Sequence, residues 1–174
     1  MTAHGQLAPR ERDAQVSTSK SRLAFVLFLA AVPAGHYLAW WLGPSWHRLP
    51  ATAERLLRAA GYIMMFVSCW LHSVAAAELG QAFDRLVTPG SLVTSGVYAS
   101  LQHPIYTSYM LLFCGHCLSL GSPLIAALLL AACLAYYSVR TCTEEGLLYA
   151  EFGQQYEEYH RRVGRFLPRL HPAD

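Results

Sequence analysis

The sequence predicts an all-α integral membrane protein with about four transmembrane helices, including a helical hairpin, and a C-terminal amphipathic helix. Of its 174 residues, 54% are hydrophobic and only 14% are charged, whereas about 25% of residues in soluble domains are charged. The apolar residues also gather in long blocks without Lys, Arg, Asp or Glu. Because a bilayer core needs about 20 apolar residues in a helix, these blocks favour transmembrane spans over a soluble bundle with a very apolar core.

The first two apolar blocks are each long enough for one span. Residues 1–21 are polar and irregular, and we expect a disordered tail there, followed by a membrane domain at residues 22–174. We expect the first span at residues 23–42, because tryptophans that suit the membrane interface, Trp40, Trp41 and Trp46, lie at its end. The second span is expected at residues 54–79, around a charge-free core.

The third apolar block, residues 105–139, is too long for a single span. Gly121-Ser122-Pro123 near its centre predicts a turn, so we expect a hairpin of two shorter spans. The CGHC stretch at residues 114–117 copies the spacing of a redox motif, but it lies in the middle of a span. That position favours small residues that pack one helix against another, over a redox or metal site.

The segment after the hairpin predicts an amphipathic helix, because its apolar residues recur every three or four positions. These residues are Leu148, Phe152, Tyr156, Tyr159 and Val163. The arginines that follow resemble a membrane-surface anchor. They are Arg161, Arg162, Arg165 and Arg169. Basic residues flank both ends of the membrane domain, which places both on one side, although three arginines in the first loop argue the other way.

Scarce polar side chains return to one membrane face from two segments. They are Tyr98, His103 and Tyr106 before and at the start of the hairpin, and Arg140, Glu144 and Glu145 after it. Arg140 and Glu144 are four residues apart and share a helix face, so a helix-end ion pair is the simplest explanation of that pair. Together the set suits a zwitterion, because Glu144 favours an ammonium and the tyrosines can pack on a sulfonium cation or an aromatic base.

The stretch LVTSGVYASLQHPIY, together with RTCTEEGLLYAEFGQQYEEYHRRVGRFLP, resembles the isoprenylcysteine carboxyl methyltransferase family and its phospholipid methyltransferase relatives. The shared pattern is a G-x-Y-x-x-x-R-H-P-x-Y loop, a hairpin, an R-x-x-x-E-E step, F-G-x-x-Y-x-x-Y and a terminal basic segment with a proline, over residues 86–170. The resemblance implies a membrane methyltransferase that uses S-adenosylmethionine to methylate a C-terminal isoprenylcysteine carboxylate or a similar lipid-linked acceptor. Phospholipid N-methylation of an ethanolamine-type amine is the alternative, and a non-catalytic membrane protein that keeps the fold is the alternative from another class.

The resemblance also implies a site, with the cofactor between the loop and the helix after the hairpin and with Arg140 orienting the acceptor. The implied cofactor contacts are Gly90, Ser91, Leu92, Val93, Tyr98, His103, Pro104, Ile105, Tyr106 and Glu144. The implied partners are the membrane and a lipid or prenylated-protein acceptor, with no metal and no nucleic acid. The cofactor site is expected to face the cytosol, from the endoplasmic reticulum in a eukaryote or from the inner membrane in a bacterium.

The sequence departs from the family pattern at Gln102, where the family has Arg. Losing that charge is expected to weaken cofactor binding, and Gln102→Arg is expected to leave activity equal or higher. The residues also bear on the chemistry of the acceptor. A carboxylate acceptor needs an orienting cation and no base, whereas a protonated amine needs a base for which the sequence offers no clear candidate. This favours carboxyl methylation.

Overall fold

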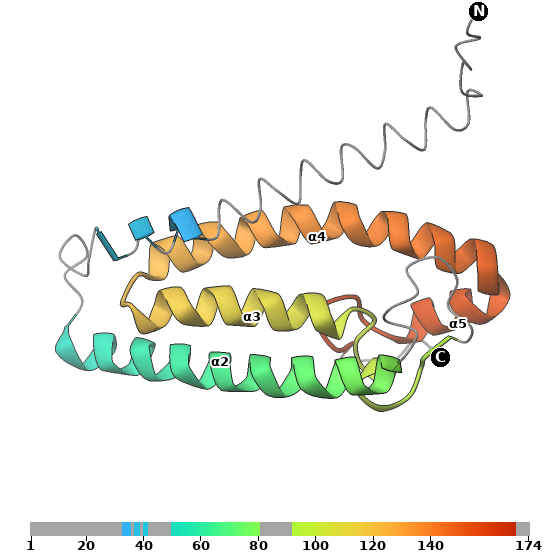
Figure 1. Cartoon of the computed structure of the whole chain (residues 1–174), viewed down its shortest axis with the longest axis horizontal. Helices are drawn as coiled ribbons and strands as arrows, with labels where there is room; N and C mark the ends of the chain where they lie inside the picture. The colour runs from blue at the N-terminus through green and yellow to red at the C-terminus, as the bar shows by residue number, and fades with distance from the viewer. Residues whose placement is uncertain (1–32, 36, 39, 42–49, 81–91, 170–174) are drawn as a thin grey trace, which may run out of the picture.

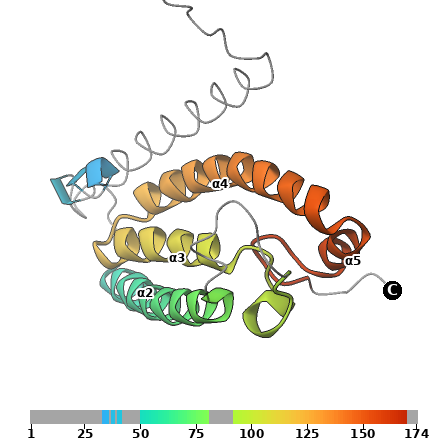
Figure 2. The ribbon, with the colours of Figure 1, turned by 45° about the vertical axis from the view of Figure 1, so that its right-hand side comes forward.

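Three long helices lie side by side, and a short helix lies at one end of them (Figure 1). The computed structural model describes residues 33–35, 37–38, 40–41, 50–80 and 92–169. The named elements within these ranges are all helical: α2 (Ala51–Leu79), η3 (Gly96–Ala99), α3 (Pro104–Ser119), α4 (Pro123–Phe152) and α5 (Gln154–Arg162). In both views α3 lies between α2 and α4 (Figure 2). The predicted tail and most of the predicted first span lie outside the described residues.

Two helices, α2 and α4, are long and apolar enough to cross a membrane. Only 22% and 33% of the residues in their most apolar windows are buried, so most of this surface faces outward, unlike a core helix of a soluble protein. The predicted second span is therefore confirmed as a helix of suitable length and composition. A count of four spans is not confirmed within the described residues, because α3 has only 16 residues, about 24 Å at 1.5 Å per residue.

The predicted hairpin is present, with its turn between Ser119 and Pro123, but its halves are unequal. The expectation of a short span is right for α3 and wrong for α4, which has 30 residues. The reason is that α4 does not end with the charge-free block. It continues past Arg140 and Glu144 to Phe152, and an i,i+4 ion pair between the first two supports that extension.

Helices α2 and α3 approach closely where each carries a glycine. A Cβ on Gly61 would lie 2.5 Å from the carbonyl oxygen of Gly115, so a side chain cannot be added without moving a helix. Gly115 belongs to the CGHC stretch, whose cysteines Cys114 and Cys117 are buried in the helix core together with Cys133 of α4. The prediction that this stretch packs one helix against another is therefore confirmed.

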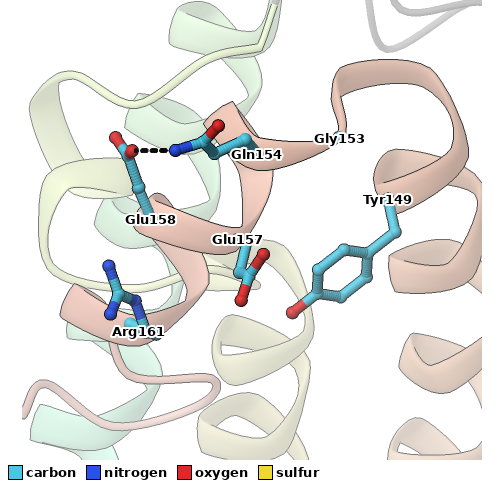
Figure 3. A pocket seen from close by; sticks show the side chains of 6 residues that line it. All are labelled: Tyr149, Gly153, Gln154, Glu157, Glu158 and Arg161. Atoms are coloured by element: carbon cyan, nitrogen blue, oxygen red, sulfur yellow. Dashed lines mark hydrogen bonds between the residues drawn. The ribbon is translucent and has the colours of Figure 1, made fainter.

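The predicted C-terminal amphipathic helix is divided in two by Gly153. This residue has φ +52°, a left-handed conformation that glycine adopts without strain, and the helix direction changes there. The predicted apolar stripe is confirmed as a buried cluster, since Tyr156, Tyr159 and Val163 pack with Leu92, Leu148 and Phe152. The stripe thus packs α5 against the protein. A surface hollow of about 440 Å³ lies beside the bend (Figure 3), lined by Tyr149, Gly153, Gln154, Glu157, Glu158 and Arg161.

The chain after α5 folds back along the loop that precedes α3. The backbone N–H groups of Gln102 and His103 donate to the carbonyl oxygens of Gly164 and Arg165, at 2.8 and 3.1 Å. Thr107 Oγ1 also donates to the carbonyl oxygen of Phe166, at 3.0 Å. This pairing brings the loop, the start of α3, the charged part of α4 and the C-terminal segment to one end of the helices.

Candidate functional site

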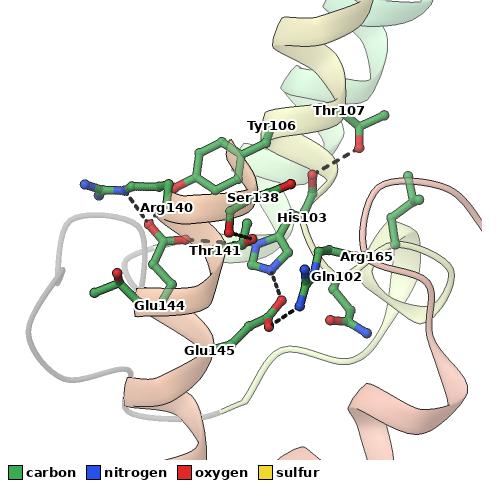
Figure 4. A network of polar contacts seen from close by, with 12 residues as sticks. Gln102, His103, Tyr106, Thr107, Ser138, Arg140, Thr141, Glu144, Glu145 and Arg165 are labelled. Carbon is green, nitrogen blue, oxygen red and sulfur yellow. Dashed lines mark hydrogen bonds and ion pairs between the residues drawn. The ribbon is translucent and has the colours of Figure 1, made fainter. Parts of the chain in front are cut away.

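His103 lies at the centre of the polar groups at this end of the helices (Figure 4). It is the residue before α3, and Pro104 occupies the first turn, as predicted. Proline suits that position, because its fixed φ matches the helix and its missing N–H would have no partner there. The imidazole is 9% exposed and faces two carboxylates of α4, Glu144 on one side and Glu145 on the other.

One carboxylate oxygen of Glu144 accepts two hydrogen bonds. Tyr106 Oη donates to Glu144 Oε1 at 2.5 Å, and Arg140 Nε donates to the same oxygen at 2.9 Å. The ion pair expected from the spacing of Arg140 and Glu144 is therefore confirmed. The second oxygen, Glu144 Oε2, lies 4.0 Å from His103 Nδ1. Tyr106 is held between other rings, with its centroid 5.7 Å from His103 and 4.6 Å from Tyr137.

Glu145 is the carboxylate to which the sequence analysis gave no role. It is 6% exposed, and its two oxygens accept from His103 Nε2 at 3.2 Å and from Arg165 NH2 at 2.7 Å. The prediction that Arg165 belongs to a membrane-surface anchor is therefore wrong, because its guanidinium binds a buried carboxylate. The two adjacent glutamates of the R-x-x-x-E-E step could have indicated this role in the sequence. Adjacent residues of a helix point about 100° apart, so their side chains can lie on either side of one group.

His103 is held neutral by its surroundings. Burial lowers the pKa of His103, and the hydrogen bond to Glu145 and the charges of both carboxylates only partly oppose that effect. A carboxylate can only accept, so Nε2 carries the proton that is donated to Glu145. Nδ1 then keeps its lone pair and faces Glu144. The site therefore holds a neutral imidazole acceptor beside a carboxylate, between two arginines.

Other predicted site residues lie around this network or beyond it. Tyr98 is buried, and its hydroxyl donates to the carbonyl oxygen of Ala75 at 3.4 Å, so its side chain joins η3 to α2. Burial and the charge of Glu78 raise the pKa of Tyr98 to about 12. Leu92 packs on the apolar cluster of α5. Val93 and Ile105 are half-buried, and Gly90 and Ser91 lie outside the described residues.

Gln102, at the position of the family arginine, is buried, and its side chain joins the loop to the end of α5; we call it a buried clamp. Its Nε2 donates to the carbonyl oxygens of Val163 and His160 at 2.5 and 3.1 Å, and its Oε1 lies 3.0 Å from His160 Nδ1. The positive charge expected beside His103 comes instead from Arg165. The expectation that Gln102→Arg leaves activity unharmed must therefore be revised, because arginine would bury a charge where an amide now satisfies three partners.

Comparison with known proteins identifies the fold and the family. Residues 55–155, more than half of the chain, match the model of the family described as "Phospholipid methyltransferase". The chain belongs to this family. Membership implies a methyl donor. Among solved structures, the eukaryotic intramembrane Ras methyltransferase (isoprenylcysteine carboxyl methyltransferase) matches 86% of this chain and 54% of its own, with a TM-score of 0.65. Its sequence identity of 23% makes this a likeness of fold.

Several curated relatives are named protein-S-isoprenylcysteine O-methyltransferase. The protein of Schizosaccharomyces pombe is 32% identical over 104 residues, covering 57% of this chain and 44% of the relative. The protein of Rattus norvegicus is 32% identical over 117 residues, covering 64% and 41%. The protein of Dictyostelium discoideum is 26% identical over 140 residues, covering 78% and 58%. The chain thus spans less than half the length of the first two of these relatives.

Proposed function

We propose that this chain is an integral-membrane, S-adenosylmethionine-dependent methyltransferase that methylates the carboxylate of a C-terminal isoprenylcysteine or a similar lipid-linked acceptor. The observation that carries the proposal is the polar network at one end of long apolar helices, in which two arginines and two glutamates surround His103. Support also comes from the fold shared with an intramembrane methyltransferase and from relatives whose names specify isoprenylcysteine.

The side chains of the network suit distinct roles. When bound, the methyl donor supplies an activated methyl group on a sulfonium. Glu144 and Tyr106 offer a carboxylate and a hydroxyl to its charged end, and the aromatic rings beside His103 suit a cation. Arg140 is one-third exposed at the edge of the network, where it can orient the carboxylate of an acceptor. Transfer to a carboxylate needs no base, so positioning and exclusion of water supply most of the acceleration.

An amine acceptor is the second candidate, and one observation favours it. The sequence offered no clear base for a protonated amine, whereas the structure provides a neutral His103 with a lone pair on Nδ1. The family description, "Phospholipid methyltransferase", points the same way. The carboxylate acceptor remains our first proposal, because relatives that match 57% and 64% of this chain carry the isoprenylcysteine name. We further propose that the site faces the cytosol.

The acceptor can be identified by transfer of a labelled methyl group. Purified protein in detergent would be given labelled S-adenosylmethionine with a farnesylated cysteine peptide, the same peptide with its carboxylate amidated, or phosphatidylethanolamine. We expect label only on the free carboxylate, as an ester that mild base releases. Base-stable label on phosphatidylethanolamine would support the amine acceptor instead. Folded protein that neither transfers label nor binds the donor would refute the enzyme and support a non-catalytic protein.

Two variants separate the roles within the site. Glu144→Gln removes the charge that faces the donor, so we expect donor binding to weaken about tenfold, as expected for one charged hydrogen bond. Arg140→Ala should lower kcat by a larger factor than it weakens donor binding, because its proposed partner is the acceptor. Donor binding is measured by titration without acceptor, and turnover with saturating donor. Equal effects of both variants on binding would contradict this division of roles.

A further inference from the structure

The glycine that opens the G-x-Y-x-x-x-R-H-P-x-Y pattern lies against a carboxylate of α2. This residue, Gly96, has φ +57°, and a Cβ added to it would lie 1.9 Å from Glu78 Oε1. The other oxygen, Glu78 Oε2, accepts a hydrogen bond from the backbone N–H of Val97 at 2.8 Å. A side chain at position 96 would therefore displace Glu78, so the contact requires a glycine there as much as the backbone conformation does.

The contact supplies a cap that the start of η3 lacks. Ser95 precedes η3, but its side chain makes no capping hydrogen bond. The first N–H groups of a helical turn have no partner within that turn, and Glu78 provides an acceptor for one of them from the last turn of α2. Tyr98 makes a second link to the same helix, because its hydroxyl donates to the carbonyl oxygen of Ala75 at 3.4 Å. The beginning of η3 is thus attached to α2 by two side chains.

Backbone hydrogen bonds extend this attachment toward His103. The carbonyl oxygen of Val97 accepts from the N–H groups of Ser100 and Leu101, at 3.2 and 3.0 Å. The next two residues, Gln102 and His103, donate from their N–H groups to the C-terminal segment. Glu78 therefore fixes one end of a short hydrogen-bonded stretch whose other end places the imidazole between the two carboxylates of α4.

We propose that Glu78 is a positioning residue of the methyl-donor site, which holds η3 against α2 and thereby keeps His103 in the arrangement that binds the donor. The inference rests on the proposed function, and it adds α2 to a site otherwise built from the loop, α3 and α4. Glu78 acts through the backbone of Val97 and needs no contact with the donor. Without it, fewer molecules hold the binding arrangement, and the apparent affinity falls by the same factor as that fraction.

Three variants of α2 test this role: Glu78→Ala, Glu78→Gln and a matched control, Glu54→Ala. Donor affinity would be measured in detergent by titration with S-adenosylhomocysteine, and kcat with saturating donor and the farnesylated cysteine peptide. Loss of one hydrogen bond to a charged group changes an equilibrium by about tenfold or more, so we expect Glu78→Ala to bind about tenfold more weakly. Its kcat should be nearly unchanged, because saturating donor selects the binding arrangement.

The other two variants should bind the donor as the wild type does. Glu78→Gln keeps a side chain of the same length with an acceptor oxygen for the N–H of Val97. Glu54→Ala removes a carboxylate that pairs with Arg58 at the opposite end of α2, so it can change the unfolding midpoint without reaching the loop. Rescue by glutamine, together with an unaffected control, distinguishes positioning of the loop from a general loosening of α2.

The contact between Glu78 and Gly96 can be tested without a ligand. Gly96→Ala should lower the unfolding midpoint, because its Cβ would displace the carboxylate and its φ is strained for alanine. Combining Gly96→Ala with Glu78→Ala should lower the midpoint by less than the sum of the two single effects, since the clash needs both side chains. Additive effects would show that the two residues do not meet.

The remaining outcomes separate the inference from the proposed function. Unchanged affinity in Glu78→Ala, with a lowered midpoint, would show that Glu78 only stabilises the fold and would overturn the inference alone. Weaker binding in Glu54→Ala to the same extent would overturn it as well, because the effect would then be common to α2. A wild-type protein that binds no S-adenosylhomocysteine would refute the proposed function, and the positioning role with it.

Discussion

Replacing Glu145 with glutamine should destabilise the protein, because this carboxylate joins three segments. Its two oxygens accept from His103 at the start of α3 and from Arg165 in the C-terminal segment, while its own backbone belongs to α4. Glutamine has the same shape but only one acceptor oxygen. Its NH2 group must then face either the imidazole or the guanidinium. Facing the guanidinium it sets donor against donor, and facing the imidazole it requires the ring to change tautomer; in both cases the charge of the acceptor is lost.

The size of the effect follows from burial and charge. Glu145 is 6% exposed, so its lost contacts are not replaced by water. A hydrogen bond to a charged group contributes about 1.5–3 kcal/mol. The Arg165 side chain is 36% exposed and regains part of its hydration, which reduces the loss. We therefore expect a decrease of about 2 kcal/mol in the free energy of unfolding, or about 4–8 °C in the unfolding midpoint for a chain of this size.

The assay is thermal unfolding of the purified protein in one detergent, without ligand. The matched control is Glu158→Gln on α5, because Glu158 is exposed and its contact is a surface hydrogen bond to Gln154 at 3.3 Å. The control should stay within about 0.5 kcal/mol of the wild type. In Glu145→Gln with Arg165→Gln, the combined loss should be smaller than the sum, since the two residues share one interaction. A midpoint for Glu145→Gln equal to that of the control would refute the reasoning.

Three further changes test other parts of the structure. The pKa of His103 in the folded protein lies below its usual 6.5. At a pH between these two pKa values, the unfolded state therefore binds more protons than the folded state. The unfolding midpoint should fall as the pH drops through that window, and His103→Gln should flatten this dependence. Gly115→Ala should lower the midpoint, since its Cβ would lie 2.8 Å from the carbonyl oxygen of Gly61, whereas Gly146→Ala in open space should raise it slightly. Gln102→Arg should lower the free energy of unfolding by about 2 kcal/mol and should lower methyl-transfer activity. Unfolding and methyl-transfer assays measure the two effects. Activity at or above that of the wild type would contradict the buried role of Gln102.

The sequence predicted the features that depend on local spacing. The second span, the hairpin, the helix start at Pro104 and the ion pair between Arg140 and Glu144 all follow from composition or from residues within one or two turns. The end of α4 was predicted too early, because the prediction used the end of the charge-free block. That point marks only where the helix leaves an apolar environment. A helix itself ends where the backbone requires it, here at Gly153.

The contacts of Glu145 could not be predicted, because they depend on a segment that returns from 20 residues further along the chain. Arg165 can reach Glu145 because the chain after α5 forms hydrogen bonds with the backbone of Gln102 and His103. In the sequence, Arg165 is one of several arginines after an amphipathic stripe, and nothing local distinguishes it from its neighbours. The same backbone pairing explains why Gln102 serves as a clamp.

The electrostatics of the network bear on the choice between the two acceptors. Two arginines, two glutamates and a neutral imidazole leave the network without net charge, at the end of helices with apolar outer surfaces. Methylation of a carboxylate joins a cationic donor with an anionic acceptor and gives neutral reacting groups, whereas methylation of a neutral amine only moves a positive charge. Since charges interact more strongly at low dielectric, exclusion of water accelerates the first reaction more than the second. On the proposed function, a substitution that admits water beside Arg140 should therefore slow carboxylate methylation more than it slows methylation of an amine.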